Sequence, residues 1–229
     1  PTHWLGTDQY GRDILSRVMK GAINSIIVGM VAVSIGMSVG ILLGSLAAFY
    51  KKWVDESIMR ISDVLYGFPA VLSAILITSI LGPGVVNSMM AIGIFNIPIF
   101  ARLTRATSLS IWERDYVTSA KAIGRSDAGI IWRHILPNIL SSLIVQGTVQ
   151  FAIAILAEAG LSYLGLGTQP PHASWGRMLQ EAQTFMGTSV WLAIFPGCAI
   201  ALAVLGFNLL GDGLRDMLDP KLSRIQQRI

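Results

Sequence analysis

Few residues of this 229-residue chain have the type and spacing that catalysis or metal binding needs. The three histidines, His3, His134 and His172, are far apart, and none has a ligand spacing such as HxxxH. The single cysteine, Cys198, lies in an apolar run, so we expect neither an intrachain disulfide nor a cysteine-based metal site. The sequence therefore predicts no metal site and no catalytic residue.

Nucleotide-binding and hydrolytic motifs are also missing. The sequence contains no GxxxxGK[ST] loop to hold ATP phosphates, no HExxH and no GxSxG. Glu158 is the acid nearest the interior of an apolar segment, where acids usually have a function. Because it falls at the end of its segment, we expect it to pair or cap. Asp63 and Asp212 also fall at segment ends, where water or an arginine can meet them.

The composition is that of an integral membrane protein. Hydrophobic residues make up 53% of the chain and charged residues 13%, whereas soluble domains carry about 25% charged residues. The net charge of +4 is small and spread along the chain, so nucleic acid is not an expected partner. This composition predicts a protein that is embedded in the lipid bilayer.

Four charge-free runs supply five predicted spans across a hydrocarbon core about 30 Å thick. The run at residues 64–101 would be about 57 Å long as a helix, which is too long for one span and suits two. A turn is expected at residues 81–84 between them. The other runs are residues 21–50, 134–157 and 187–211. We expect an all-α polytopic helical bundle.

Glycines and prolines within these runs predict where helices pack and bend. Gly36, Gly40 and Gly44 recur every fourth residue and make a smooth strip where another helix backbone can come close. Helix packing is the simpler interpretation, and a pore-lining role would be additional. Pro69 is expected to bend its span, and Pro196 with the glycine after it to interrupt the last one.

Lysines and arginines predict the orientation of the chain. Thirteen of the 17 fall at residues 51–63, 102–133 and 212–229, and four at residues 1–20 and 158–187. The richer group is predicted to be cytoplasmic, so the C-terminus faces the cytoplasm and residue 1 faces the exterior. Because no signal-peptide run precedes the first span, we expect a missing upstream span, which makes six in the complete protein.

These assignments divide the chain into three parts. Residues 1–20 are predicted to form an external amphipathic lead-in, and residues 213–229 a cytoplasmic tail. The transmembrane domain comprises residues 21–212, with a cytoplasmic loop at 102–133 and an external segment at 158–187. Within the external segment, Ser174 is a predicted N-cap for an interfacial helix or a shallow re-entrant element.

The longest charged, helix-like stretch, residues 113–137, has the pattern of a docking element. A short helix is expected whose apolar face carries Tyr116, Val117, Ala120 and Ile123. Gly124 can end this helix, and Ser126 can cap a second one. A loop that fits into a groove on another protein needs two amphipathic helices, whereas a simple connection does not. A loop lying on lipid headgroups is the alternative.

The same stretch resembles the EAA loop of bacterial ABC importer permeases, which has the pattern E-A-A-x3-G-x9-I-x-L-P. The matching positions are Thr118, Ser119, Ala120, Gly124, Leu136 and Pro137. This sequence departs from the pattern at two positions. Thr118 replaces the acid, and His134 stands where the pattern has isoleucine.

Three further stretches extend the resemblance over essentially the whole chain. They read HWLGTDQYGRDILSR at 3–17, LSYLGLGTQPPHASWG at 161–176 and FNLLGDGLRDMLDPKL at 207–222. They are similar to signatures of the C-type permease subunit of dipeptide, oligopeptide and nickel ABC importers, which are binding-protein-dependent inner-membrane components. The resemblance implies the type I ABC importer permease fold, with an additional N-terminal span.

The resemblance also implies partners in the bacterial inner membrane. A second, homologous permease would enclose the translocation path together with this chain, and an external solute-binding protein would deliver the substrate. Two cytoplasmic ATPase subunits would bind ATP and Mg, so this chain itself would hold no cofactor. Closure of the ATPases would swing the permeases between inward and outward opening.

The implied contact with an ATPase is a coupling helix in the 113–137 segment. Its predicted residues are Tyr116, Val117, Thr118, Ser119, Ala120, Gly124 and Arg125. The small residues Ala120 and Gly124 would allow close approach, and Leu136 with Pro137 would set the angle between loop and span. The outer segment would touch the binding protein or the partner permease.

The function implied is ATP-driven import of di- or oligopeptides, while nickel, a metal chelate and glutathione stay open as substrates. A secondary transporter that works alone would need ionisable groups at mid-span or repeated halves. An intramembrane enzyme would need a polar catalytic set at membrane depth. The sequence contains no clear example of either.

Overall fold

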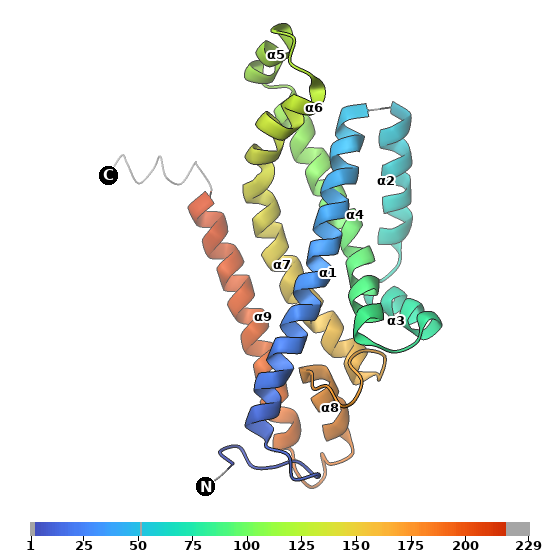
Figure 1. The fold of residues 1–229 in the computed structure, drawn as a ribbon, viewed down its shortest axis with the longest axis vertical. Coiled ribbons are helices and arrows are strands. Elements are labelled where there is room, and N and C mark those ends of the chain that lie inside the picture. Colours follow the sequence, from blue (N-terminus) through green and yellow to red (C-terminus); the bar gives the residue numbers. More distant parts are fainter. Residues whose placement is uncertain (1–2, 51, 219–229) are drawn as a thin grey trace, which may run out of the picture. The chain divides into compact units, whose positions relative to one another are not determined.

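The computed structural model describes residues 3–50 and 52–218, and these residues are almost entirely helical (Figure 1). In this part of the chain, strand-like pairing is limited to an isolated antiparallel bridge between Thr7 and Asp13. The helices are α1 (Ile14–Tyr50), α2 (Lys52–Gly67), α3 (Ala70–Leu81), α4 (Val85–Trp112), α5 (Asp115–Ala122), α6 (Asp127–Ile130), the π-helical turn η1 (Ile131–Ile135), α7 (Leu136–Tyr163), α8 (Trp175–Gln183) and α9 (Trp191–Leu218).

Four helices are long and apolar enough to cross a membrane. They are α1, α4, the continuous helix Asp127–Tyr163 and α9. The pair α2 and α3 supplies a fifth span if the two cross together. The predicted all-α, polytopic fold is confirmed.

The second span is built differently from the prediction. The sequence predicts that the second span begins at residue 64, after the charged residues 51–63, but α2 begins at Lys52 and continues to Gly67. The helix breaks at Phe68, because a residue that precedes a proline is pushed out of the helical conformation. Pro69 itself has an extended ψ of 119°. The 12 residues of α3 reach only about 18 Å, so a complete span needs part of α2.

Other boundaries differ because helices continue past the charges and prolines that end apolar runs. α4 continues through Arg102, and α9 runs unbroken through Pro196, so the interruption predicted there is wrong. α1 begins at Ile14, and the described part of residues 1–20 contains no separate interfacial helix. The predicted tail begins within α9, and its residues 219–229 lie outside the described part.

The chain divides into two compact units, and the boundary falls within α1, α4, α7 and α9. Unit 1 comprises Pro1–Ser34, Pro69–Ile94 and Gln150–Phe207. Unit 2 comprises Ile35–Phe68, Phe95–Val149 and Asn208–Ile229.

In unit 2, the C-terminal half of α1 lies directly on α4. Three glycines of α1 meet three residues of α4: Gly36 meets Asn96, Gly40 meets Phe100 and Gly44 meets Ala101. A Cβ added to Gly40 would lie 2.5 Å from the Cβ of Phe100 and 2.8 Å from the carbonyl oxygen of Ile97. Carbon atoms cannot approach so closely, so the two backbones can meet here only because these residues are glycine.

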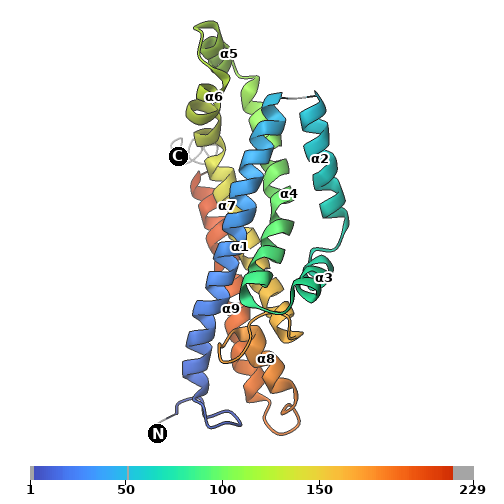
Figure 2. The ribbon, with the colours of Figure 1, turned by 45° about the vertical axis from the view of Figure 1, so that its right-hand side comes forward.

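Ion pairs fasten α2 to the C-terminal half of α4, and Figure 2 shows these two elements of unit 2 alongside each other. The Arg105 guanidinium donates two hydrogen bonds to the Asp55 carboxylate. Arg102 donates to Asp63 and also lies over the ring of Tyr66, 4.7 Å from its centroid. The expectation that Asp63 meets an arginine is confirmed.

In unit 1, the N-terminus of α8 fits between α1 and α7. Any Cβ at Gly176 would lie less than 3 Å from the backbone of Ala159, so α8 rests directly on α7. Trp175 is buried, and its Nε1 donates to the carbonyl of Val18 on α1 at 3.0 Å. The Ser174 hydroxyl accepts from a backbone N–H of the first turn, as an N-cap does.

Gly40→Val should weaken unit 2, because the new side chain would force α1 away from α4. We expect a loss of about 2 kcal/mol of stability, seen as a lower melting temperature of the purified protein in detergent. Gly206→Val is the matched control, since no atom lies within 4 Å of a Cβ at that position on α9. Equal melting of the two variants would contradict the close contact.

Candidate functional site

The 113–137 segment of unit 2 is built from two short helices separated by a glycine. At the end of α5, the Gly124 N–H donates to the Lys121 carbonyl at 2.9 Å and the Arg125 N–H to the Ala120 carbonyl at 3.2 Å. This is the Schellman pattern of helix termination. Gly124 has a φ of +81°, a left-handed conformation that favours glycine. The helix therefore ends where the sequence predicts.

The second helix begins at Ser126, whose hydroxyl accepts a hydrogen bond from the Gly129 N–H at 3.3 Å. It continues through α6 and η1 into α7 without a break. Leu136 and Pro137 therefore lie where segment and span join in one continuous helix. The π-helical turn accommodates Pro137. In a regular α-helix, the ring of a proline would clash with the backbone carbonyl four residues before it, and the proline has no N–H to bond to that carbonyl. The wider π-helical turn moves the carbonyl away.

The predicted contact residues divide between two faces of α5. Val117 and Ala120 are buried, so their side chains pack inside the chain and are closed to a partner. Burial corrects the predicted contact for these two residues, which hold α5 in place. The exposed members are Tyr116, Thr118, Ser119, Gly124 and Arg125.

Two large apolar side chains outside the predicted contact set stand in solvent. Ile123 is 82% exposed and Trp132 is 74% exposed. Both side chains are therefore accessible to a partner protein. The sequence does not single these two residues out, because the same stretch contains apolar residues that are buried, such as Ile130 and Ile135.

Two aromatic contacts hold the segment together. The ring of Tyr116 lies 6.2 Å from the ring of His134, centroid to centroid, and links α5 to η1. The Lys121 ammonium lies 4.0 Å from the centroid of the Trp112 ring, a cation–π contact that ties α5 to the end of α4. His134, which departs from the family pattern, therefore has a role in positioning α5.

Unit 2 also contains a cavity of about 550 Å³ with a polar wall. One face of α7 contributes Ser141, Ser142 and Gln146, and α9 contributes Asp212 and Arg215. Polar side chains on membrane-spanning helices face one another or water, not lipid. We therefore expect this cavity to face water or another protein and not lipid.

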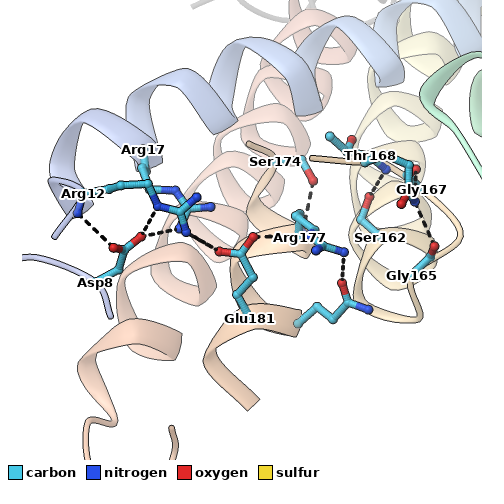
Figure 3. Close-up of polar contacts among 12 residues, drawn as sticks. Asp8, Arg12, Arg17, Ser162, Gly165, Gly167, Thr168, Ser174, Arg177 and Glu181 are labelled. Carbon is cyan, nitrogen blue, oxygen red and sulfur yellow. Dashed lines mark hydrogen bonds and ion pairs between the residues drawn. The ribbon is translucent and has the colours of Figure 1, made fainter. Parts of the chain in front are cut away.

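A cluster of charged side chains joins the N-terminal segment to α1 and α8 in unit 1 (Figure 3). Asp8 accepts from Arg12 Nε at 2.7 Å and from Arg17 Nη1 at 2.8 Å. Glu181 accepts from the same two arginines at 2.9 Å and 2.8 Å. Arg177 adds a bond to Glu181 at 3.3 Å. Two acids and three bases thus make one network.

The network keeps its carboxylates ionised. Burial opposes ionisation of Asp8, but backbone N–H groups of Arg12 and Tyr10 and the two guanidinium groups outweigh it and hold the pKa of Asp8 below its ordinary value. Burial likewise opposes ionisation of Glu181, and its arginine neighbours, Arg17 foremost, keep its pKa below the ordinary value. The pattern of the sequence does not predict this cluster.

Glu158 is buried and accepts hydrogen bonds from three hydroxyl groups. Ser25 donates at 3.0 Å, Ser162 at 2.6 Å and Thr168 at 3.2 Å. Backbone N–H groups of Trp175 and Thr168 donate to the hydroxyls of Ser25 and Ser162, which leaves the hydroxyl hydrogens free to point at Glu158. Within the described residues it has no ion-pair partner, so hydrogen bonding takes the place of the predicted pairing.

Known proteins resemble this chain in sequence and in fold. A family model described as binding-protein-dependent transport system inner membrane component matches residues 40–224. The dipeptide transport system permease protein DppC of Alkalihalophilus pseudofirmus is 48% identical over 220 residues, 96% of this chain and 72% of the relative. The glutathione transport system permease protein GsiD of Pectobacterium atrosepticum is 49% identical over 220 residues, 96% of this chain and 73% of the relative.

Solved structures share the fold at low sequence identity. A chain of the MetNI methionine ABC transporter in an inward-facing conformation matches with a TM-score of 0.69 and 16% identity, over 90% of this chain and 96% of that one. A chain of an amino acid ABC transporter matches with a TM-score of 0.66 and 17% identity, over 89% and 95%. The fold is that of type I ABC importer permeases, as the resemblance implies.

Glu158→Leu should destabilise unit 1, because three hydroxyl groups would lose their shared acceptor. Unsatisfied buried polar groups cost about 1–3 kcal/mol each, so we expect faster proteolysis at residues 164–174 and a lower melting temperature. Leu161→Ile, a volume-conserving change at a buried neighbour on α7, is the control. Wild-type protease resistance of Glu158→Leu would show that the network is dispensable.

The charged cluster should stabilise the protein in a pH-dependent way. Because the folded-state pKa values of Asp8 and Glu181 lie below their unfolded values, the unfolded state takes up protons first as the pH falls. The stabilisation is complete above the ordinary carboxyl pKa of about 4 and is lost as the pH falls through the lowered values.

Thermal melting of wild type and Asp8→Asn at several pH values tests this dependence. At pH 7 the variant should be less stable by about 2 kcal/mol, and the difference should shrink below about pH 4. Glu56→Gln is the control, because Glu56 pairs with Arg60 at an exposed site, where ion pairs contribute about 0–1 kcal/mol. A difference that stays constant with pH would refute the electrostatic origin.

Proposed function

This chain belongs to the family of binding-protein-dependent transport system inner membrane components, and from that premise we propose that its 113–137 segment couples it to an ATPase. The chain is a multi-pass inner-membrane permease subunit of an ABC importer, and as such it is a transport component and not an enzyme. The coupling segment, the partners and the substrate are the parts that the proposal adds.

The exposed apolar surface of the segment is the observation that carries the proposal. Ile123 and Trp132 stand in solvent, while Val117 and Ala120 anchor α5 to the rest of the chain. An anchored helix with an exposed apolar side chain at its end is suited to a groove on another protein. The helix that begins at Asp127 continues into the span, so a movement of the segment can be passed to it through the helix backbone.

The proposed partners follow from this role. Two ATPase subunits bind ATP and Mg in the cytoplasm, and one of them holds the segment in a groove. A second, homologous permease completes the translocation path. A solute-binding protein delivers substrate to the external face. The 113–137 segment and the C-terminus are cytoplasmic, and residue 1 is external, in line with the distribution of lysine and arginine.

The proposed substrates are di- or oligopeptides, since a dipeptide permease is 48% identical to this chain. Glutathione, itself a tripeptide, is the second candidate, because a glutathione permease is 49% identical. The polar cavity of unit 2 supports a hydrated path beside α7, with Gln146 able to bond to peptide groups. Uptake of labelled dialanine and glutathione by the assembled complex distinguishes the two.

The coupling role is tested by co-purification of the ATPase subunits with Gly124→Trp. The bulky ring at an exposed position should cut recovery of the ATPase by about tenfold, without lowering the amount of permease in the membrane. Gly82→Trp is the matched control, with a φ of +91° and no atom within 4 Å of an added Cβ.

Ile123→Asp removes the apolar contact without backbone strain and should give the same loss of ATPase. Wild-type recovery of the ATPase with both variants would discard the coupling assignment.

A further inference from the structure

A groove of about 520 Å³ opens at the start of α1 in unit 1. One wall comes from the first three turns of α1 and the residues before it, and the other from residues 171–173. The amide Nδ2 of Asn24 donates to the carbonyl of Ala173 at 2.6 Å and fixes the second wall to the first. The volume falls in the range of small-molecule sites, about 300–1,000 Å³.

The groove is rich in positive charge. Arg12, Arg17 and Lys20 line it, together with His172 and one acid, Asp13. The oxygens of Asp13 are already occupied, because they accept from the backbone N–H and hydroxyl of Ser16 and approach His3. The acid therefore acts as an N-cap of α1, and its ion-pair contact is with His3 and not with the arginines or the lysine of the groove.

The charges around the groove do not balance. Two acids outside the lining, Asp8 and Glu181, share Arg12 and Arg17. Even with these acids and with Arg177 of the same network, four bases face three acids. Lys20 is exposed and has no ion-pair partner in the part of the chain that the structure describes. The groove therefore carries one positive charge that has no ion-pair partner among the described residues.

Hydrogen-bond donors are left over as well. Arg17 uses only Nη1 in its bonds to Asp8 and Glu181, so its Nε and Nη2 have hydrogens to donate. Arg12 uses Nε and Nη2 and keeps Nη1. Because the network clamps both guanidinium groups, they lose little freedom when they bind a further acceptor. A planar group with two negatively charged oxygens suits such donors.

We propose that this groove is an anion subsite that takes the carboxylate of the transported solute as it enters the permease. Lys20 supplies the unpaired charge, Arg12 and Arg17 supply fixed donors, and Pro171 and Ala173 offer an apolar wall to the rest of the solute. The inference rests on the proposed function, since peptides and glutathione carry the carboxylate it requires. A phosphate of a lipid headgroup presents similar chemistry, so the test must separate the two sources.

Protection of Lys20 from acylation tests the subsite directly. The complete complex is placed in nanodiscs of zwitterionic phosphatidylcholine without ATP, and a succinimidyl acetate reagent labels its lysines, which mass spectrometry quantifies. Dialanine should slow acylation of Lys20 about fivefold relative to exposed Lys52, whereas the C-terminal amide of dialanine should not. The amino groups of the peptides also consume reagent, which slows acylation of both lysines equally. The acylation rate of Lys20 is therefore expressed relative to that of Lys52.

Three other outcomes of the labelling experiment would contradict the proposed subsite. Equal effects of the acid and the amide would remove the role of the carboxylate. Protection found only in nanodiscs of anionic phosphatidylglycerol, without dialanine, would assign the groove to lipid. Protection that appears only when the solute-binding protein is added, with no effect of dialanine, would assign it to that protein.

Transport kinetics of variants give a second, independent measurement. Lys20→Gln should raise the KM for dialanine about fivefold and leave kcat unchanged, while Lys52→Gln should change neither. An unchanged KM for Lys20→Gln would reject the subsite. If the wild-type complex takes up no peptide, the proposed substrate class is wrong. The labelling experiment tests the subsite separately, because it does not depend on uptake.

Discussion

The direct contact between the backbones of α1 and α4 in unit 2 is the constraint on which that unit depends. Between helices in lipid, there is no gain from hiding apolar surface from water, so stability comes from close packing and from hydrogen bonds. Gly40 permits that packing, because nothing larger fits against Phe100. α4 in turn holds α2 through Asp55 and Asp63 and contacts the 113–137 segment through Trp112.

Unit 1 is held by polar groups to a greater extent. Its N-terminal segment, α1 and α8 meet at the carboxylates of Asp8 and Glu181, and α7 joins them through Glu158. The charged cluster and the Glu158 network have one feature in common. In each, further bonds hold the hydrogen-bond donors in the orientation in which they donate to a carboxylate. The arginines are clamped by two acids, and the hydroxyls of Ser25 and Ser162 are oriented by backbone N–H groups.

Features that depend on neighbours in sequence could be predicted well. The helix stop at Gly124 and the caps at Ser126 and Ser174 lie within a few residues of the groups they bond, so their pattern is visible in the chain itself. Apolar length likewise predicts helices that can cross a membrane. Their ends were less predictable, because α4 and α9 continue into charged residues that water or an ion pair can satisfy.

Features that depend on tertiary packing could not be predicted. Periodicity places Val117 and Ile123 on one face of α5, yet the first is buried and the second is exposed, because the helix ends before its last turn can pack. Arg17 and Glu181 are 164 residues apart, and no local pattern pairs them. The same holds for the groove, whose two walls come from the start of α1 and from residues 171–173.

The hydrogen bonds of Glu158 impose an order on biosynthesis. Ser25 leaves the ribosome long before the carboxylate does, but Ser162 and Thr168 follow it, and the backbone N–H of Trp175 comes last. Glu158 therefore gains its last hydroxyl donor, Thr168, only after a further 10 residues have emerged. The translocon, which lets polar side chains stay in contact with water, is the place where this interval can pass without the acid entering lipid.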